Sequence, residues 1–213
     1  MYKLVIMDWD GTIADTREGA MLALNHTLVL NNYPPIDEDF FNVIGHDGIE
    51  SLAASAAGIP LGTDQSRELR DQYIRNYMET AECSLFEGVY ETLEAMQKSS
   101  IVLALLTNKS RSLCEVQLRL TGSEKFFSYV QCDDGSVALK PAPNGVFRIA
   151  EHFNVGLDDI LMVGDSWTDI MAAKNAGASS CFVEYGIGEI DLSDISPQYK
   201  ISSFKELLPL LGM

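Results

Sequence analysis

A short apolar segment at the start of the chain ends abruptly in two aspartates. Residues 4–7 lead directly into Asp8, Trp9, Asp10 and Gly11. An apolar run of that length, bounded by glycine, is typical of a fully buried strand in a parallel sheet. Because ligands of open α/β sheets bind outside the carboxyl ends of the strands, Asp8 and Asp10 lie where we expect chemistry.

The spacing of the two aspartates raises a question of charge. Side chains two residues apart on an extended backbone point to the same side, so the Asp8 and Asp10 carboxylates repel one another unless a cation lies nearby. Ligands that are oxygen only favour Mg²⁺ among the divalent cations. An isolated Asp-x-Asp pair is more often a pair of solvated loop acids, so the rest of the chain must decide between the two interpretations.

The composition restricts the class of protein and its partners. The 213 residues are 46% hydrophobic, and the formal net charge of -16 argues against nucleic acid and anionic membrane surfaces as partners. No stretch approaches the ~20 apolar residues of a membrane span, and the N-terminal apolar run is too short for a signal peptide. The four cysteines are scattered without metal-ligand spacing, which indicates reduced thiols in a cytoplasmic protein.

The first part of the chain is predicted to be helical. Thr16 is a candidate N-cap for a helix that ends near residue 31, before Pro34 and Pro35. Glycine and proline separate three further predicted helices, near residues 37–43, 47–57 and 63–82. We expect no strand between residues 16 and 85, so this block is predicted to be a helical bundle inserted after the first strand.

From residue 86 onward, predicted strands alternate with predicted helices. Apolar runs predict strands at residues 101–106, 129–132, 160–163 and 180–184, and helical spacing predicts helices at residues 89–97, 110–120, 143–153, 167–176 and 204–211. Such alternation is typical of a doubly wound parallel sheet with helices on both faces. The sequence therefore predicts an α/β core domain, residues 1–15 and 86–213, interrupted by a helical domain, residues 16–85.

Polar residues follow the ends of two further predicted strands and occupy the loop between them. They are Thr107, Asn108, Lys140, Asp165 and Asp169. If the strands are neighbours in the sheet, these side chains converge on the two N-terminal aspartates. The collection suits phosphoryl transfer, which needs an in-line nucleophile, a cation for the phosphoryl oxygens and fixed donors. An aspartate is able to serve as the nucleophile of such a reaction.

Four segments occur along the chain in an order that characterises one enzyme family. They are Asp8-Trp9-Asp10-Gly11-Thr12, Thr107-Asn108, Lys140-Pro141 and Gly164-Asp165-Ser166-Trp167-Thr168-Asp169. The ordered set resembles the haloacid dehalogenase superfamily of phosphohydrolases, and the resemblance covers essentially the whole chain. Within the superfamily, Leu85-Phe86-Glu87-Gly88-Val89 resembles the lead into the core domain of phosphoglycolate-phosphatase-like members. The resemblance implies a Rossmann-like core with an inserted helical cap domain.

The resemblance also implies a division of catalytic roles. Asp8 would be the nucleophile. Asp10 would protonate the leaving oxygen and later deprotonate the attacking water, which explains why two carboxylates are needed. Thr107 would hydrogen-bond the transferring phosphoryl group, and Lys140 would pair with the phosphoryl oxygens and with Asp8.

A Mg²⁺ site is a further implication of the resemblance. Asp8 and the backbone carbonyl of Asp10 would bind the ion. Asp165 would complete the site, with Asp169 as a direct or water-mediated ligand. Mg²⁺ is thus the expected cofactor.

Four residues would lie beside the substrate. Gly11 would permit close approach of the backbone, Thr12 would orient Asp10, and Asn108 would lie beside the phosphoryl group. Arg17 either reaches the substrate from the start of the helical insert or belongs to the solvated face of its helix. The glycine-rich turn at residues 44–48 is the part of the insert that we expect to approach the site.

We therefore predict a cytoplasmic, Mg²⁺-dependent phosphatase that hydrolyses small, phosphoglycolate-like phosphate monoesters through an aspartyl-phosphate. Its partner would be a small phosphorylated metabolite, and the sequence leaves monomer and homodimer open. A phosphomutase or a pyrophosphatase on the same scaffold is one alternative, and a non-catalytic interaction protein that retains the fold is another. The insert holds only four basic residues, which does not favour a polyanionic substrate.

Overall fold

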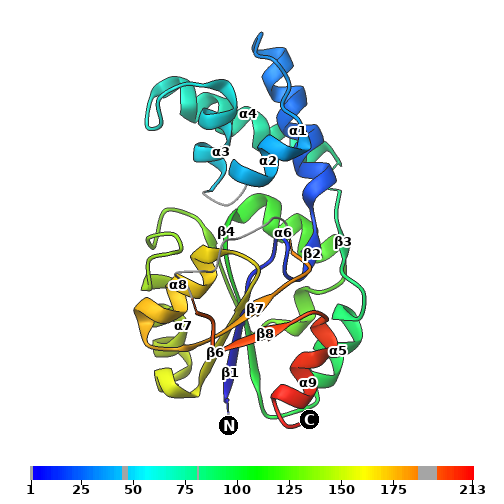
Figure 1. Ribbon diagram of the computed structural model, residues 1–213, viewed down its shortest axis with the longest axis vertical. Helices are drawn as coiled ribbons and strands as arrows, with labels where there is room; N and C mark the ends of the chain where they lie inside the picture. The colour runs from blue at the N-terminus through cyan, green and yellow to red at the C-terminus, as the bar shows by residue number, and fades with distance from the viewer. Residues whose placement is uncertain (1, 45–47, 81, 187–195) are drawn as a thin grey trace.

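The computed structural model describes residues 2–44, 48–80, 82–186 and 196–213. Its centre is a six-stranded sheet in the order β5-β4-β1-β6-β7-β8, in which each neighbouring pair is parallel (Figure 1). The strands are β1 (Leu4–Met7), β4 (Val102–Ser110), β5 (Tyr129–Asp133), β6 (Ile160–Gly164), β7 (Ser179–Val183) and β8 (Tyr199–Ile201). The predicted α/β fold with a doubly wound parallel sheet is confirmed.

Helices cover both faces of this sheet (Figure 1). They are α5 (Val89–Gln97), α6 (Arg111–Leu120), α7 (Asn144–Phe153), α8 (Trp167–Ala176) and α9 (Leu207–Leu210). The central strand β1 is apolar throughout because its side chains alternate between two cores: Val5 and Met7 pack with α5, α6 and α9, and Leu4 and Ile6 pack with α7 and α8. All four side chains are fully buried, which is worth about 1.5–3 kcal/mol each.

Two strands and the last helix differ from the sequence prediction. β4 continues beyond residue 106, because Ser110 still pairs with Asp133 of β5 after a shift in register. β8 was not predicted, since its three residues are too few to show a pattern, and its place is fixed by pairing with β7. Short 3₁₀ turns lie at Glu124–Phe126, Leu157–Asp159 and Phe204–Glu206, the last of them at the start of the predicted final helix.

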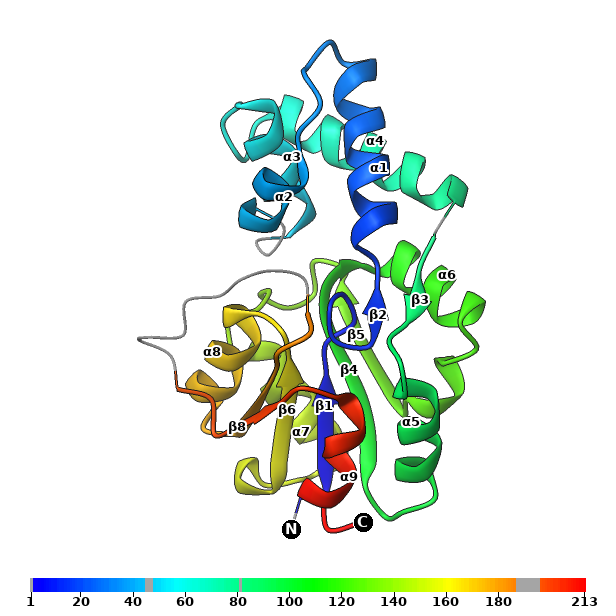
Figure 2. The same ribbon diagram turned by 45° about the vertical axis from the view of Figure 1, so that its right-hand side comes forward.

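A second layer of helices lies above the carboxyl edge of the sheet (Figure 2). It contains α1 (Arg17–Leu30), α2 (Glu38–Ile44), α3 (Ile49–Ala57) and α4 (Asp64–Thr80). This helical layer has an apolar core of its own, in which Leu24 and Leu28 of α1 meet Leu69 and Tyr73 of α4. Within the predicted turn at residues 44–48, residues 45–47 lie outside the described residues.

The chain enters and leaves the helical layer through two short strands that pair with each other. β2 (Ala14–Asp15) and β3 (Ser84–Leu85) are antiparallel. The prediction that residues 16–85 contain no strand was therefore wrong at β3, because a two-residue strand leaves no periodicity in the sequence. The two segments that connect the sheet to the helical layer, β2 and β3 with the residues next to them, therefore lie side by side, and we call them the two crossings.

The position predicted for the cap of the first helix is confirmed, but the capping hydrogen bond is not. Thr16 is the N-cap residue of α1, and its side chain makes no capping hydrogen bond. Its hydroxyl donates instead to Asp10 Oδ1 at 2.6 Å. The start of the helical layer is thus tied to the loop that follows β1.

Tyr77 of α4 connects both crossings to the core. Its buried hydroxyl lies 3.1 Å from the carbonyl oxygens of Thr16 and Glu82, and it accepts a hydrogen bond from Gln117 Nε2 at 3.1 Å. Gln117 Oε1 in turn accepts from the indole N–H of Trp9 at 2.9 Å. One buried tyrosine therefore links the helical layer, α6 and the loop after β1.

Replacing Tyr77 by phenylalanine is expected to lower the free energy of unfolding by about 1–3 kcal/mol, because buried polar groups lose their partner. Chemical denaturation measures the change. Tyr33→Phe is the matched control in the helical layer, since the Tyr33 hydroxyl accepts only an exposed hydrogen bond from Gln65, and we expect it to cost less than about 0.5 kcal/mol. Equal losses in the two variants would contradict the role given to Tyr77.

Candidate active site

A cleft opens between the carboxyl edge of the sheet and the helical layer, with a volume of about 750 Å³ that includes its opening to solvent. On the side of the sheet it is lined by Asp8, Asp10, Thr107, Asn108, Lys109, Lys140, Asp165, Ser166 and Thr168. Asp8 and Asp10 follow β1, and residues 107–109 lie in the last part of β4. Lys140 lies in the loop before α7, and Asp165, Ser166 and Thr168 lie after β6 and at the start of α8. Polar residues far apart in the sequence thus meet in one place because neighbouring parallel strands end at the same edge.

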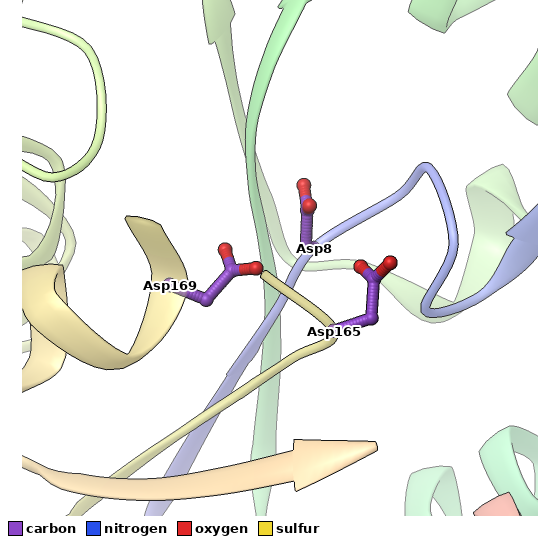
Figure 3. A group of neighbouring side chains, drawn as sticks. All are labelled: Asp8, Asp165 and Asp169. Atoms are coloured by element: carbon purple, nitrogen blue, oxygen red, sulfur yellow. The ribbon is translucent and has the colours of Figure 1, made fainter. Parts of the chain in front are cut away.

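Three buried carboxylates lie together at the floor of this cleft, two of which, Asp8 and Asp165, line it. Asp8, Asp165 and Asp169 each offer an oxygen within 4.8 Å of the others (Figure 3). Burial raises the pKa of the Asp8 carboxyl to about 7, with Lys140 opposing the shift and Asp169 adding to it. Three acids in so small a space favour a bound cation, and their oxygen donors suit a hard divalent metal.

Lys140 lies among these carboxylates and is almost fully buried. Its ammonium nitrogen is 2.8 Å from Asp8 Oδ1 and 2.6 Å from Asp169 Oδ1. Burial alone would lower the pKa of Lys140, but the carboxylates of Asp169 and Asp8 raise it above its ordinary value. Lys140 is therefore a fixed positive charge beside Asp8, as the sequence predicted.

Asp169 has both of its carboxylate oxygens engaged within the protein. Oδ1 accepts from Lys140, and Oδ2 accepts from the backbone N–H of Ser166 at 3.0 Å and from its hydroxyl at 2.6 Å. The Ser166 hydroxyl also accepts from the Asp169 N–H, which completes a capping box at the start of α8. Asp169 is thus held rigidly and orients Lys140.

Asp10 follows Asp8 by two residues, but its side chain makes different contacts. Asp10 Oδ1 accepts from the Thr16 hydroxyl at 2.6 Å and from Lys109 Nζ at 2.7 Å. It is not one of the three clustered carboxylates. The implied binding of a metal by its backbone carbonyl stays a prediction.

Lys109 is the site residue that the sequence analysis missed. Its side chain is almost fully buried, and its ammonium forms the ion pair with Asp10 and lies 5.2 Å from the centre of the Tyr77 ring. Burial would lower the pKa of Lys109, but the Asp10 carboxylate raises it above its ordinary value. A signal was present in the sequence: two residues after Thr107 on an extended strand, Lys109 points to the same side.

Thr107 and Asn108 both line the cleft, as expected. The Asn108 side chain donates to the Lys140 carbonyl at 2.9 Å and accepts from the Lys140 N–H at 2.9 Å. It therefore fixes the backbone that carries Lys140. The predicted contacts of Thr107 and Asn108 with a phosphoryl group stay predictions.

Gly11 and Thr12 support Asp165. The Thr12 hydroxyl donates to Asp165 Oδ1 at 2.9 Å, so the expectation that it orients Asp10 was wrong. Gly11 has a φ of +74°, and a Cβ there would lie 2.0 Å from Asp165 Oδ2, so the close approach requires glycine. Neither residue is among the described residues that line the cleft, and their contact with substrate stays a prediction.

Arg17 lines the cleft at the start of α1. Its guanidinium lies 3.2 Å from Glu38 Oε1 and donates to the Gly186 carbonyl at 3.3 Å. These contacts hold the side chain between the helical layer and the loop after β7. The predicted contact of Arg17 with a substrate stays a prediction.

The fold and the site together define a class of protein. A doubly wound parallel sheet carries buried aspartates and a buried lysine at its carboxyl edge, beneath helices inserted after the first strand. This is the arrangement of an α/β enzyme whose chemistry takes place at the ends of the strands. The family model described as haloacid dehalogenase-like hydrolase matches residues 5–183, and the chain belongs to this family.

Individual relatives agree with the family. The chain is 29% identical over 213 residues to a phosphoglycolate phosphatase of Agrobacterium fabrum, covering 98% of this chain and 91% of that protein. It is 30% identical over 218 residues to the pyrophosphatase PpaX of Bacillus velezensis, covering 98% and 96%. Its structure matches a predicted phosphoglycolate phosphatase from Haemophilus somnus with a TM-score of 0.90 at 27% identity, covering 99% and 98%. The predicted superfamily and enzyme class, a hydrolase of the phosphatase type, are confirmed.

In the part of the chain that the structure describes, no helix combines the length and the apolar character needed to cross a membrane.

Proposed function

We propose that the protein is a Mg²⁺-dependent phosphatase that hydrolyses small phosphate monoesters by way of an aspartyl-phosphate. The observation that carries the proposal is the Asp8 carboxylate. It is buried at the end of β1, and its Oδ1 lies 2.8 Å from the Lys140 ammonium. A phosphoglycolate phosphatase and a pyrophosphatase among the relatives support phosphoryl chemistry.

The donors of the site suit Mg²⁺. The clustered carboxylates of Asp8, Asp165 and Asp169 are buried and offer only oxygen as ligand atoms. We propose that Asp8, Asp165 and the Asp10 carbonyl hold the ion, with Asp169 as a direct or water-mediated ligand. When bound, the ion supplies positive charge to the oxygens of the phosphoryl group.

Asp8 and Asp10 would divide the reaction between them. An Asp8 oxygen attacks phosphorus and forms the aspartyl-phosphate, while the bond from phosphorus to the leaving oxygen breaks and Asp10 gives that oxygen a proton. Asp10 then takes a proton from water, the resulting hydroxide oxygen bonds to phosphorus, and Asp8 leaves as a carboxylate. Lys140 and the Thr107 hydroxyl stabilise charge on the phosphoryl oxygens during both steps.

Two donors hold the Asp10 carboxyl in place. Lys109 Nζ lies 2.7 Å from Asp10 Oδ1, and the Thr16 hydroxyl donates to the same oxygen at 2.6 Å. Lys109 therefore positions Asp10. Because Thr16 precedes α1, the state of Asp10 is connected to the position of the helical layer.

We propose that residues 16–85 form a cap domain over a core domain of residues 1–15 and 86–213. The separate apolar core of the helical layer and the two adjacent crossings support this division. A cap that closes over the cleft would exclude bulk water from the aspartyl-phosphate until the product alcohol has left.

An assay of the purified protein with p-nitrophenyl phosphate and a panel of phosphorylated metabolites, with and without Mg²⁺, tests the proposal. We expect release of inorganic phosphate that requires the metal. Absence of turnover on every compound would overturn the proposal and favour a non-catalytic interaction protein.

A pyrophosphatase is the second candidate, favoured by the relative of that name in Bacillus velezensis. Phosphate release from inorganic pyrophosphate at a higher kcat/KM than from any monoester would select it. Conversion of one sugar phosphate into its isomer without phosphate release would instead indicate a phosphomutase.

Stabilisation by Mg²⁺ is expected to depend on pH. The raised pKa of Asp8, about 7, means that the folded protein without metal retains the Asp8 proton up to that pH, and its stability falls as the pH rises from about 4 to 7. Mg²⁺ must displace the proton, so its apparent affinity falls as the pH falls through 7. Thermal unfolding should therefore show a larger increase in Tm on addition of Mg²⁺ at about pH 8 than at about pH 6. An equal increase at both values would contradict the assignment of Asp8 as a ligand.

We also propose that the protein is cytoplasmic and acts on a small phosphorylated metabolite. The four cysteines are all free, which suits a reducing compartment. The negative net charge disfavours nucleic acid and anionic membranes as partners.

A further inference from the structure

The side of the cleft formed by the sheet and the side formed by the helical layer differ in chemical character. The sheet contributes charged and hydroxyl groups. The helical layer contributes Thr16, Arg17 and Gly48 and, beside them, a wall made of Ala20, Phe41, Ile49, Leu52 and Tyr73. We call these five residues the apolar wall. We propose that the substrate is a phosphate monoester whose leaving group is uncharged and has an apolar face, alkyl or aryl, rather than one with a second anionic group. This inference rests on the proposed phosphatase function and names the substrate class of the same site.

The apolar wall is built into the helical layer from all four of its helices. Ala20 comes from α1, Phe41 from α2, Ile49 and Leu52 from α3, and Tyr73 from α4. Phe41, Leu52 and Tyr73 are at most 5% exposed, so their cleft surface is backed by the layer's own core. With the phosphoryl group at Asp8, the rest of the substrate extends toward this wall, where contact with an apolar group is favourable.

The described cations that line the cleft already have carboxylate partners. Lys140 pairs with Asp8 and Asp169, Lys109 pairs with Asp10, and Arg17 pairs with Glu38. A leaving group that carried a carboxylate or a second phosphate would have to replace Glu38 at the partly exposed Arg17, break a buried pair of Lys140 or Lys109, or be buried without a counter-charge. The last two choices are unfavourable in a buried site.

Two neutral or weakly polar features complete the wall. Burial raises the pKa of the Tyr73 phenol far above its ordinary value, so this group stays neutral and is able to donate to an uncharged oxygen of the substrate. The second feature is the N-terminus of α3, which begins at Ile49 in the wall and carries only the partial positive charge of the helix dipole. Glu50, which follows Ile49 in α3, is paired with Arg70.

A matched pair of substrates tests the inference directly. Phosphoglycolate and isobutyl phosphate have nearly the same shape, because two methyl groups replace the two carboxylate oxygens. We expect the kcat/KM for isobutyl phosphate to exceed that for phosphoglycolate by at least about tenfold. A preference for phosphoglycolate or pyrophosphate in an active enzyme would overturn the inference and leave the phosphatase proposal standing. Failure of both substrates and of p-nitrophenyl phosphate would instead overturn the proposed function.

A cation placed on the apolar wall should reverse the preference. Ile49 is only half-buried, so Ile49→Lys is expected to fold and to shift the ratio of kcat/KM toward phosphoglycolate by about tenfold or more. Ile49→Gln, which removes the apolar side chain without adding charge, should lower activity on isobutyl phosphate without helping phosphoglycolate. Leu61→Lys adds the same charge at an exposed position of the helical layer outside the cleft, and should leave the ratio unchanged. An unchanged ratio in Ile49→Lys, or an equal shift in Leu61→Lys, would contradict the placement of the leaving group.

Discussion

Asp8→Asn is expected to lower kcat by at least about 10⁴-fold while the fold is retained. The amide has almost the size of the carboxylate, but it is a poor nucleophile toward phosphorus. Without metal, the variant should unfold at the same temperature as the original protein or a higher one above pH 7, because it no longer buries an acid whose pKa is raised to about 7. Steady-state turnover of p-nitrophenyl phosphate and thermal unfolding measure the two effects.

The control for this experiment is the same chemical change at a distant surface position. Asp158 is exposed in the 3₁₀ turn before β6, and Asp158→Asn should retain full activity. Residual activity of a tenth or more in Asp8→Asn would exclude Asp8 as the nucleophile. Loss of activity together with loss of the folded state would require the test to be repeated with Asp8→Glu, which keeps the charge but moves it.

Lys140→Met is expected to reduce kcat/KM by about 10²–10³-fold, because the ammonium group that stabilises the phosphoryl oxygens is lost. The variant also leaves the buried Asp8 and Asp169 carboxylates without the cation that lies 2.8 Å and 2.6 Å from them. Breaking such a pair on one side costs about 3–5 kcal/mol in unfolding free energy. Since Lys140 holds the Asp8 pKa down, its loss should also move Mg²⁺ binding to higher pH.

Kinetic and denaturation measurements on two further variants complete this test. Lys140→Arg keeps the charge but not the compact ammonium, and should recover part of the stability with less of the activity. Lys174→Met removes an exposed lysine from α8 and should change neither kcat/KM nor the free energy of unfolding. If Lys140→Met were as active and as stable as Lys174→Met, the role of Lys140 in neutralising Asp8 would be wrong.

The sequence was sufficient for five of the six strands of the sheet, all but β8, and for the clustered residues. The apolar run of β1 and the alternation of strands with helices have physical causes that act over a few residues. Because parallel strands present their carboxyl ends at the same edge of a sheet, the polar residues that lie there are then expected to converge. Asp8, Lys140, Asp165 and Asp169 could therefore be assigned to one site from the order of strands and motifs along the chain.

Pairing between particular side chains could not be predicted in the same way. The Thr12 hydroxyl bonds Asp165, which is 153 positions away, and the Lys109 ammonium bonds Asp10 across 99 positions. A pattern along the chain restricts which residues gather, but several pairings satisfy the same pattern. Thr16 is the clearest example of a pairing that the sequence leaves undetermined. A threonine at that position is chemically suited both to cap a helix and to donate a hydrogen bond to Asp10.

The attachment of the helical layer has a consequence for how such a protein can diverge. Among the described hydrogen bonds, that of the Thr16 hydroxyl joins the layer to the Asp10 carboxylate, and those of the Tyr77 hydroxyl hold the two crossings. Side chains elsewhere on α1–α4 can change without altering the carboxylates of the core. New leaving groups could therefore be accommodated by mutation of the layer alone, while the phosphoryl-transfer machinery is inherited intact.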